Sequence, residues 1–282
     1  MSRLFASASS QYLQVDVGIL TVYPITMACW FRSNDVTANH GLMWLGDKDV
    51  AAHYHALEIN AGFDDVIASS RAGGGPVEAI SSTSYTANTW HHACAVFTSA
   101  TDRAAFLDGA GKGTNATDIT PAGIDRFAIG RFADSSPVNY MDGRIAECAI
   151  WNVGLSDQEV SNLATGRVPA FRIRPDALKG YWPIGLGSPE TDLSGALNNL
   201  TVTGATVADH VPLGPLFGFD TGYGALAAAA DGPPMRSLLG VGRDCSLPII
   251  GLEWLRRRKN RIRRQYAKPS GGPGDRIIVG GP

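Results

Sequence analysis

The sequence predicts an all-β protein, built as an antiparallel sandwich with one short helix. The 33 glycines and 16 prolines make up about one residue in six, against about one in eight in a typical globular chain. Short runs rich in β-branched and aromatic residues recur at intervals of about 8–15 residues. Turn residues separate these runs up to residue 151, and no helical pattern lies between them. This arrangement favours antiparallel sheets packed face to face.

The predicted strands follow one another along the first two thirds of the chain. In order they cover residues 12–17, 24–32, 41–46, 55–60, 76–80, 90–97, 103–107, 126–130 and 143–151, with two later strands at 178–184 and 200–207. Asp-Gly pairs at 108–109 and 142–143 supply tight turns, as does the Gly-Gly-Gly-Pro cluster at 73–76. A polar loop at 189–195 separates the two later strands.

One helix of about ten residues is predicted between Ser156 and Gly166. Ser156 is a favourable N-cap, and Glu159 stands three residues later, which is the spacing of a capping box. Leu155 and Val160 occupy the positions of a hydrophobic staple. Gly166 suits the left-handed residue that ends many helices.

Charge divides the chain in two. Residues 1–220 hold 13 basic and 22 acidic side chains, a formal charge of −9, whereas residues 221–282 hold 11 and 4, a formal charge of +7. Such an asymmetry indicates an acidic body and a basic tail with a role of its own. We therefore expect a folded domain at 1–211 and a Gly/Pro-rich C-terminal extension at 212–282, with a basic helix at about 252–267.

The basic helix carries eight positive charges between residues 256 and 268 and no acidic residue. A solvated helix face, docking on an acidic protein and binding to an anionic surface are all open. Nucleic acid is the weaker candidate, because few aromatic residues accompany the charges. The residues expected to anchor the chain to a larger assembly are Arg256, Arg257, Arg258, Lys259, Arg261, Arg263 and Arg264.

The cysteines and the N-terminus indicate a reducing compartment. Cys29, Cys94 and Cys148 lie inside strand-like apolar runs and, with Cys245, show no Cys-x-x-Cys spacing, so buried free thiols are favoured over a zinc site. The first residues contain no apolar segment typical of a secretory signal, so we expect synthesis in a host cytoplasm. No apolar run reaches the length of about 18 residues that a membrane span needs.

Three motifs occur in a characteristic order. They are Ile-Thr-Met-Ala-Cys-Trp-Phe-Arg at 25–32, Asn-Thr-Trp-His-His-Ala-Cys-Ala-Val-Phe at 88–97 with Ala-Phe-Leu-Asp-Gly at 105–109, and Met-Asp-Gly-Arg-Ile-Ala-Glu-Cys-Ala-Ile-Trp-Asn at 141–152 with the helix that follows. In this order, residues 4–211 resemble the concanavalin A-like, LamG-type jelly-roll family. Segments at 180–183 and 192–195 resemble the part that usually opens these domains, so the order looks permuted. The resemblance implies a jelly-roll β-sandwich.

The chain lacks the catalytic carboxylates that the resemblance would imply for a hydrolase. Retaining hydrolases of this fold carry a Glu-x-Asp-x-x-Glu strand that presents two carboxylates on one face. This sequence has no such run, and neither Glu58 nor Glu147 has a carboxylate two residues away. Phosphate-loop, dinucleotide and Gly-x-Ser-x-Gly motifs are also missing. A glycoside hydrolase is therefore the least favoured function.

Two histidine clusters are candidate ligands. His91 and His92 are adjacent strand residues, so they point to opposite faces and cannot hold one ion together; we expect a structural strand start. His53 and His55 could share a face, and a structural role, ligand contact or metal binding is open for them.

Calcium is a possible cofactor, because members of the family often bind it at a loop edge. Calcium needs six to eight oxygen ligands. Asp47 and Asp49 form the most plausible pair and Asp64 and Asp65 the second, with a solvated acidic loop as the alternative.

A glycan site would need aromatic and polar side chains on exposed loops. The residues expected to form it are Tyr54, Arg131, Phe132, Asp134, Asn139 and Tyr140, with an ordinary turn as the alternative for 131–140. Four tryptophans lie inside strand-like runs and are expected in the core, namely Trp30, Trp44, Trp90 and Trp151.

These observations predict a non-enzymatic virion protein with a structural, decoration or adhesion role. The jelly roll would contact proteins or glycans, and the basic tail would anchor it to other capsid or tail proteins or to copies of itself. Similar chains without signal peptides are common among phage virion proteins, which is an analogy within the family. The alternative is a free or cell-associated extracellular lectin that depends on calcium.

Overall fold

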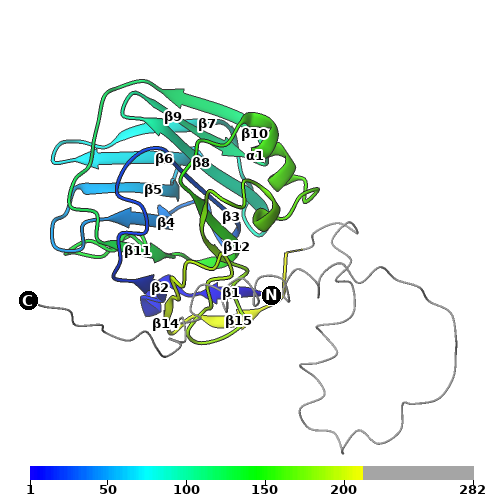
Figure 1. Ribbon diagram of the computed structural model, residues 1–282. Helices are drawn as coiled ribbons and strands as arrows, with labels where there is room; N and C mark the ends of the chain where they lie inside the picture. Colours follow the sequence, from blue (N-terminus) through cyan, green and yellow to red (C-terminus); the bar gives the residue numbers. More distant parts are fainter. Residues whose placement is uncertain (212–282) are drawn as a thin grey trace, which may run out of the picture. The chain divides into compact units, whose positions relative to one another are not determined.

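The β-rich runs of the sequence form two antiparallel sheets that pack face to face (Figure 1). The computed structural model describes residues 1–211. The predicted basic helix, its seven anchoring residues and Cys245 lie outside the described residues. The predicted antiparallel sandwich of jelly-roll type is confirmed.

The first sheet, called sheet A, runs in the order β10-β9-β8-β3-β12-β1-β15, and β13 also pairs with β12. Its strands are β1 (Ser2–Phe5), β3 (Ile25–Ser33), β8 (His91–Ser99), β9 (Asp102–Leu107), β10 (Ala110–Asn115), β12 (Gly143–Trp151), β13 (Leu178–Trp182) and β15 (Thr206–Ala208). Along one edge of β12, β1 pairs with residues 143–145 and β13 with residues 148–151.

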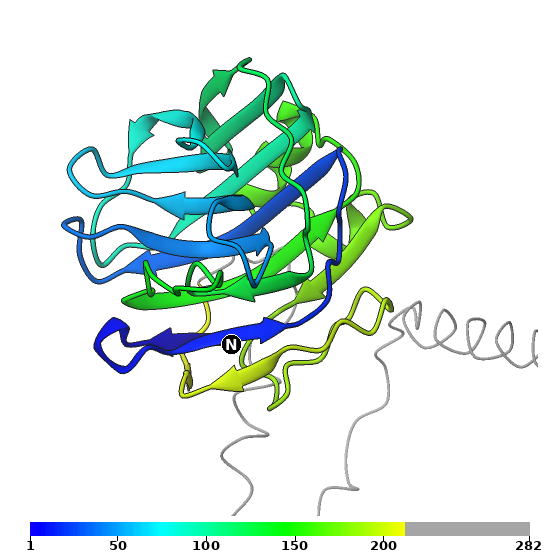
Figure 2. The same ribbon diagram turned by 90° about the vertical axis from the view of Figure 1, so that its left-hand side faces the viewer.

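The second sheet, called sheet B, runs in the order β14-β2-β11-β4-β5-β6-β7. Its strands are β2 (Tyr12–Val15), β4 (His40–Gly46), β5 (His53–Ile59), β6 (Asp65–Ala72), β7 (Val77–Ser84), β11 (Arg126–Ile129) and β14 (Thr201–Thr203). The prediction of one strand at 200–207 is wrong. Gly204 has a φ of +73° and breaks the run, so β14 joins β2 in sheet B and β15 joins β1 in sheet A. Figure 2 shows the last described segment, in yellow, beside the blue N-terminal segment.

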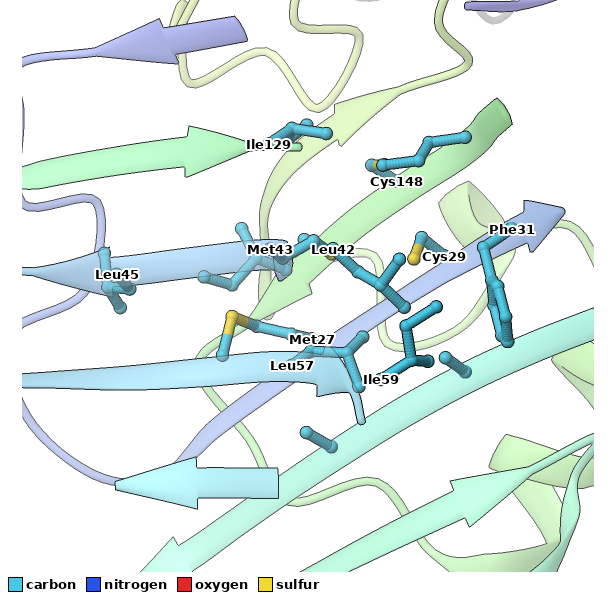
Figure 3. Packing of buried hydrophobic residues seen from close by; sticks show 14 of the residues in the cluster. Met27, Cys29, Phe31, Leu42, Met43, Leu45, Leu57, Ile59, Ile129 and Cys148 are labelled. Carbon is cyan, nitrogen blue, oxygen red and sulfur yellow. The ribbon is translucent and has the colours of Figure 1, made fainter. Parts of the chain in front are cut away.

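The core lies between the sheets, where alternate side chains of facing strands meet. Figure 3 shows this packing, with Met27, Cys29 and Phe31 of β3 opposite side chains of β4 and β5 such as Leu42 and Leu57. The prediction of buried free thiols is confirmed for Cys29, Cys94 and Cys148.

The tryptophan prediction is half right. Trp44 and Trp151 are fully buried, as expected. Trp30 and Trp90 are only half-buried, because Trp30 lies on the outer face of sheet A at the border of the end of α1 and the segment after it, and Trp90 precedes β8 rather than lying within it. The third fully buried indole in the described residues is that of Trp182.

One helix, α1 (Asp157–Ala164), covers the outer face of sheet A beside β8 and β10 (Figure 1). The predicted capping box is confirmed: the Ser156 side chain accepts the Glu159 N–H, and the Glu159 carboxylate accepts the Ser156 N–H. Gly166 follows in the left-handed conformation, with a φ of +64°. Two short 3-10 turns complete the elements, η1 (Ser7–Ser9) and η2 (Ala170–Arg172). Within residues 1–211, no helix has the length and apolar character to cross a membrane.

Candidate functional site

Two of the predicted glycan-binding residues are buried under a loop and cannot serve as exposed platforms. Tyr54 lies within β5 rather than in a loop and is 5% exposed, and Phe132 is 6% exposed. Their rings pack 5.1 Å apart on the outer face of sheet B, next to Trp44. The chain at residues 131–132 passes directly over Gly41 of β4, where a Cβ atom would come within 2.8 Å of the Arg131 carbonyl carbon. This close approach closes the segment onto the sheet and corrects the prediction.

The remaining predicted residues divide between holding this loop and facing a groove. Asp134 accepts the Ser136 N–H at 2.8 Å, and Asn139 has a φ of +54° and accepts the Gly41 N–H through its carbonyl oxygen. Both stabilise the loop itself. Arg131 instead places its guanidinium carbon 3.4 Å from the centre of the Tyr12 ring and donates to the Tyr140 hydroxyl at 3.2 Å.

A groove of about 300 Å³ opens beside this arginine, at the edge of sheet B. Its lining residues are Tyr12, Gln14, Val15, Asp16, Thr201 and Thr203. The pairing of Thr201 with Gln14 and of Thr203 with Tyr12 places these four side chains on one face of the sheet. The sequence does carry a signal for this surface, since polar residues alternate with buried Leu13 in the predicted strand 12–17.

The polar groups of the groove are fixed by two arginines. Arg126 binds the Asp16 carboxylate through both of its oxygens, from Nε at 2.7 Å and from Nη2 at 3.1 Å. The hydrogen bonds from Arg126 lower the pKa of Asp16 and keep it charged. Arg131 donates to the Gln14 side-chain oxygen, and the Gln14 amide donates to Asp16 at 3.2 Å. The groove thus presents a carboxylate, a carboxamide and two exposed threonine hydroxyls in set positions.

Glu58 has no carboxylate two residues away in the chain, but the charge of Glu78 on β7 acts on it across β6. It lies on the outer face of sheet B and is 6% exposed. Burial, with the nearby charge of Glu78 on β7, raises the pKa of Glu58 to about 8. This raised pKa favours the neutral form of the Glu58 carboxyl at pH 7.

The predicted calcium ligands Asp47 and Asp49 do come together, and Asp125 joins them. One carboxylate oxygen of each lies within 4.8 Å of the other two. The Lys48 ammonium occupies this cluster, 2.8 Å from Asp125 and in contact with Asp49. Lys48 already binds two of the three carboxylates and offsets one of their charges, so the arrangement fits calcium poorly. Asp64 and Asp65 form no such group within the described residues.

The histidine clusters hold no shared ligand site. His91 and His92 point to opposite faces as predicted, with His91 bonded to Asp108 at 2.8 Å and His92 beside Trp30. His55 is buried and bonded to the Ser70 hydroxyl at 2.8 Å, whereas His53 accepts a backbone N–H from a loop. Burial lowers the pKa of His55 to about 3, so it is neutral.

The family model of the concanavalin A-like lectin/glucanases superfamily matches residues 7–161, more than half of the chain. The chain belongs to this superfamily. The match runs from η1 into α1, so the strands that complete both sheets, β13 to β15, lie beyond it.

Solved structures are similar to this chain. A Bacteroides ovatus protein whose name proposes carbohydrate binding is 18% identical with a TM-score of 0.52; the match covers 74% of this chain and 59% of that one. The heptameric SAP-like pentraxin of Limulus polyphemus is 12% identical with a TM-score of 0.47, covering 58% and 82%. The sialidase CBM40 of Ruminococcus gnavus, bound to sialyllactose, is 12% identical with a TM-score of 0.47, covering 58% and 98%. No curated protein matches the sequence.

Proposed function

We propose that residues 1–211 form a non-enzymatic glycan-binding module whose site is the groove between β2 and β14. The observation that carries this proposal is the set of polar groups held there by Arg126 and Arg131. Sugars are recognised by planar carboxylate and amide groups and by hydroxyls that are fixed before the ligand arrives. Membership of a superfamily named for its lectins supports the same function.

The test uses the full chain on a glycan array, followed by calorimetric titration of the sugars that bind. Gln14→Ala and Asp16→Asn should each weaken binding at least about tenfold, because each removes a fixed hydrogen-bonding group. Gln158→Ala and Asp157→Asn are the matched controls, since these exposed side chains lie on α1, over the other sheet. A calcium chelator should leave binding unchanged. An array without any signal, or equal losses in the controls, would contradict the proposal.

A second role, attachment to a virus particle, is favoured by the division of charge between the acidic residues 1–220 and the basic residues 221–282. In this role the chain is made in the host cytoplasm and its basic segment binds an acidic surface of another virion protein. Replacing all seven arginines and lysines from Arg256 to Arg264 by glutamine in the full chain should remove it from purified particles, as measured by mass spectrometry. Normal incorporation of that variant would contradict this role.

A further inference from the structure

A second concave site lies on the outer face of sheet A, away from the groove of sheet B. It is a hollow of about 20 Å³, next to the C-terminal end of α1. Trp30 of β3, His92 of β8 and Glu147 of β12 line its polar side. Its apolar side is lined by Ala28, Trp151, Leu163, Gly166, Val168, Pro169 and Ala170. The volume suits one or two atoms of the size of a water molecule.

Glu147 owes its place at this hollow to a β-bulge. The pairing of β12 with β3 is irregular between Ala146 and Ala149, and Glu147 has a φ of +52°. A bulge re-aims a side chain, and a left-handed conformation is unfavourable for glutamate. The carboxylate accepts hydrogen bonds from the Tyr181 hydroxyl and from His210 Nε2 at 3.0 Å, and the side chain remains 17% exposed. A strained residue therefore holds a fixed, partly accessible carboxylate.

His92 lines the same hollow and carries a buried hydrogen-bonding atom without a partner. Its side chain is 2% exposed and its ring meets that of Trp30 edge to face, with 5.4 Å between the centres. Its Nδ1 atom is buried and has no hydrogen-bond partner within residues 1–211. Buried polar atoms without partners are rare and call for a ligand or water. Burial lowers the pKa of His92 to about 4, so the ring is neutral and adds no positive charge.

The groups around the hollow share a preference for a cation. Glu147 is an anion, and the half-buried Trp30 presents an electron-rich indole ring. The C-terminal end of a helix carries partial negative charge, and the last turn of α1 contains no basic residue to offset it. Val168 and Pro169 form an apolar border.

We propose that this hollow binds a primary ammonium group at the end of an unbranched alkyl chain. The ammonium would donate to Glu147 beside the rings of Trp30 and His92, and its methylene groups would lie against Val168 and Pro169. The ligand is either a free alkylamine or the lysine side chain of a protein, and both present the same chemistry. This site is independent of the glycan groove on sheet B.

The test measures binding to the full chain by NMR, following the ring nitrogens of His92 and the indole N–H of Trp30. The probes are pentylamine, 1,5-diaminopentane, Nα-acetyl-lysine methylamide and, as the neutral control, 1-pentanol. The three amines should shift these signals and the alcohol should not. Tighter binding of the lysine derivative would identify a protein side chain as the source, and equal or weaker binding would identify a free amine.

Variants separate this site from non-specific attraction to an acidic protein. Glu147→Gln should weaken amine binding at least about tenfold, because a charge-assisted hydrogen bond is lost. Asp157→Asn is the matched control, an exposed carboxylate on α1 that should leave the affinity unchanged. If Glu147→Gln fails to fold, acetylation of the lysine derivative's ε-amine provides the same comparison on the unaltered chain. Amines that bind no better than 1-pentanol, or equal affinity of the two variants, would overturn the proposal.

Discussion

The outer faces of the two sheets are buried in different ways. Sheet A is covered by α1, η2 and the segment between them, through an apolar cluster that includes Cys94, Phe106 and Trp151. Sheet B is covered by the irregular segment 130–141, through a smaller cluster around Trp44, Tyr54 and Phe132.

The two covers differ in how their backbone hydrogen bonds are satisfied. A helix satisfies most of its own backbone hydrogen bonds, so α1 can present an apolar stripe and needs polar partners only at its ends. An irregular loop must bond its backbone elsewhere, and it brings polar side chains with it to do so. The groove itself is lined by β2, Asp16 and β14, and this second cover contributes Arg131, which bonds Gln14 and packs on the Tyr12 ring. The hollow of sheet A lies where the helical cover ends.

The largest expected effect is the loss of unfolding free energy when a large side chain is removed from beneath each cover. Trp151→Ala should cost about 3–5 kcal/mol, because it removes a fully buried indole from the larger apolar cluster. Phe132→Ala should cost less, about 2–3 kcal/mol, because the loop can partly close over the smaller cluster. Urea unfolding of the full chain measures both. Equal costs would show that the loop packs as rigidly as the helix.

The next effect comes from Glu58 beneath the loop. Its pKa of about 8 in the folded chain exceeds the ordinary value of 4.5, so the unfolded chain loses this proton first as the pH rises. The contribution of Glu58 to the free energy of unfolding is therefore fully present below pH 4.5. It falls by about 3–4 kcal/mol by pH 8. Glu58→Gln should flatten this decline in urea titrations at several pH values. Glu78→Gln should flatten the decline less than Glu58→Gln, because it removes only the nearby charge and leaves Glu58 buried. Parallel curves for the wild type and Glu58→Gln would contradict the assignment.

His92 under the other face should respond to pH in the opposite direction. Its pKa of about 4 lies below the ordinary 6.5, so the unfolded chain takes up this proton first as the pH falls. The contribution of neutral His92 to the free energy of unfolding is fully present above pH 6.5. It declines by about 2–3 kcal/mol down to pH 4. His92→Phe should reduce that decline, and His210→Asn, a more exposed histidine, should not. An unchanged acid limb in His92→Phe would show that His55 alone carries the effect.

The sequence predicts those elements whose pattern is local. β12 begins and ends where predicted, and α1 follows its capping box, because alternation and capping depend on near neighbours. Three strands, β1, β6 and β10, were not predicted because they lack such a local pattern. β1 has only four residues, β6 is rich in small polar residues, and β10 contains two glycines, so none shows strand propensity.

The site residues were harder to predict because their exposure depends on segments that are distant in the sequence. The sequence around Tyr54 does not indicate that Phe132 will cover it. The sequence around Glu58 does not indicate that the charge of Glu78 will act on it. The groove joins residues 12–16 to 201–203, and the hollow joins three strands to a helix end. Only the sheet order places these groups together, and that order was not predicted.

The smallest effect tests whether the helical cover acts as one unit with sheet A. Ser156→Ala removes the hydroxyl that caps α1 and should cost about 1 kcal/mol in urea unfolding. Ser161→Ala within the same helix is the matched control and should be nearly neutral, because alanine is the better helix former there. Because α1 and the sheet B groove lie over different sheets, Ser156→Ala should leave glycan affinity unchanged. A weaker glycan affinity in Ser156→Ala would mean that the two outer faces are coupled through the core, and the contrast between them would then hold for their packing but not for their function.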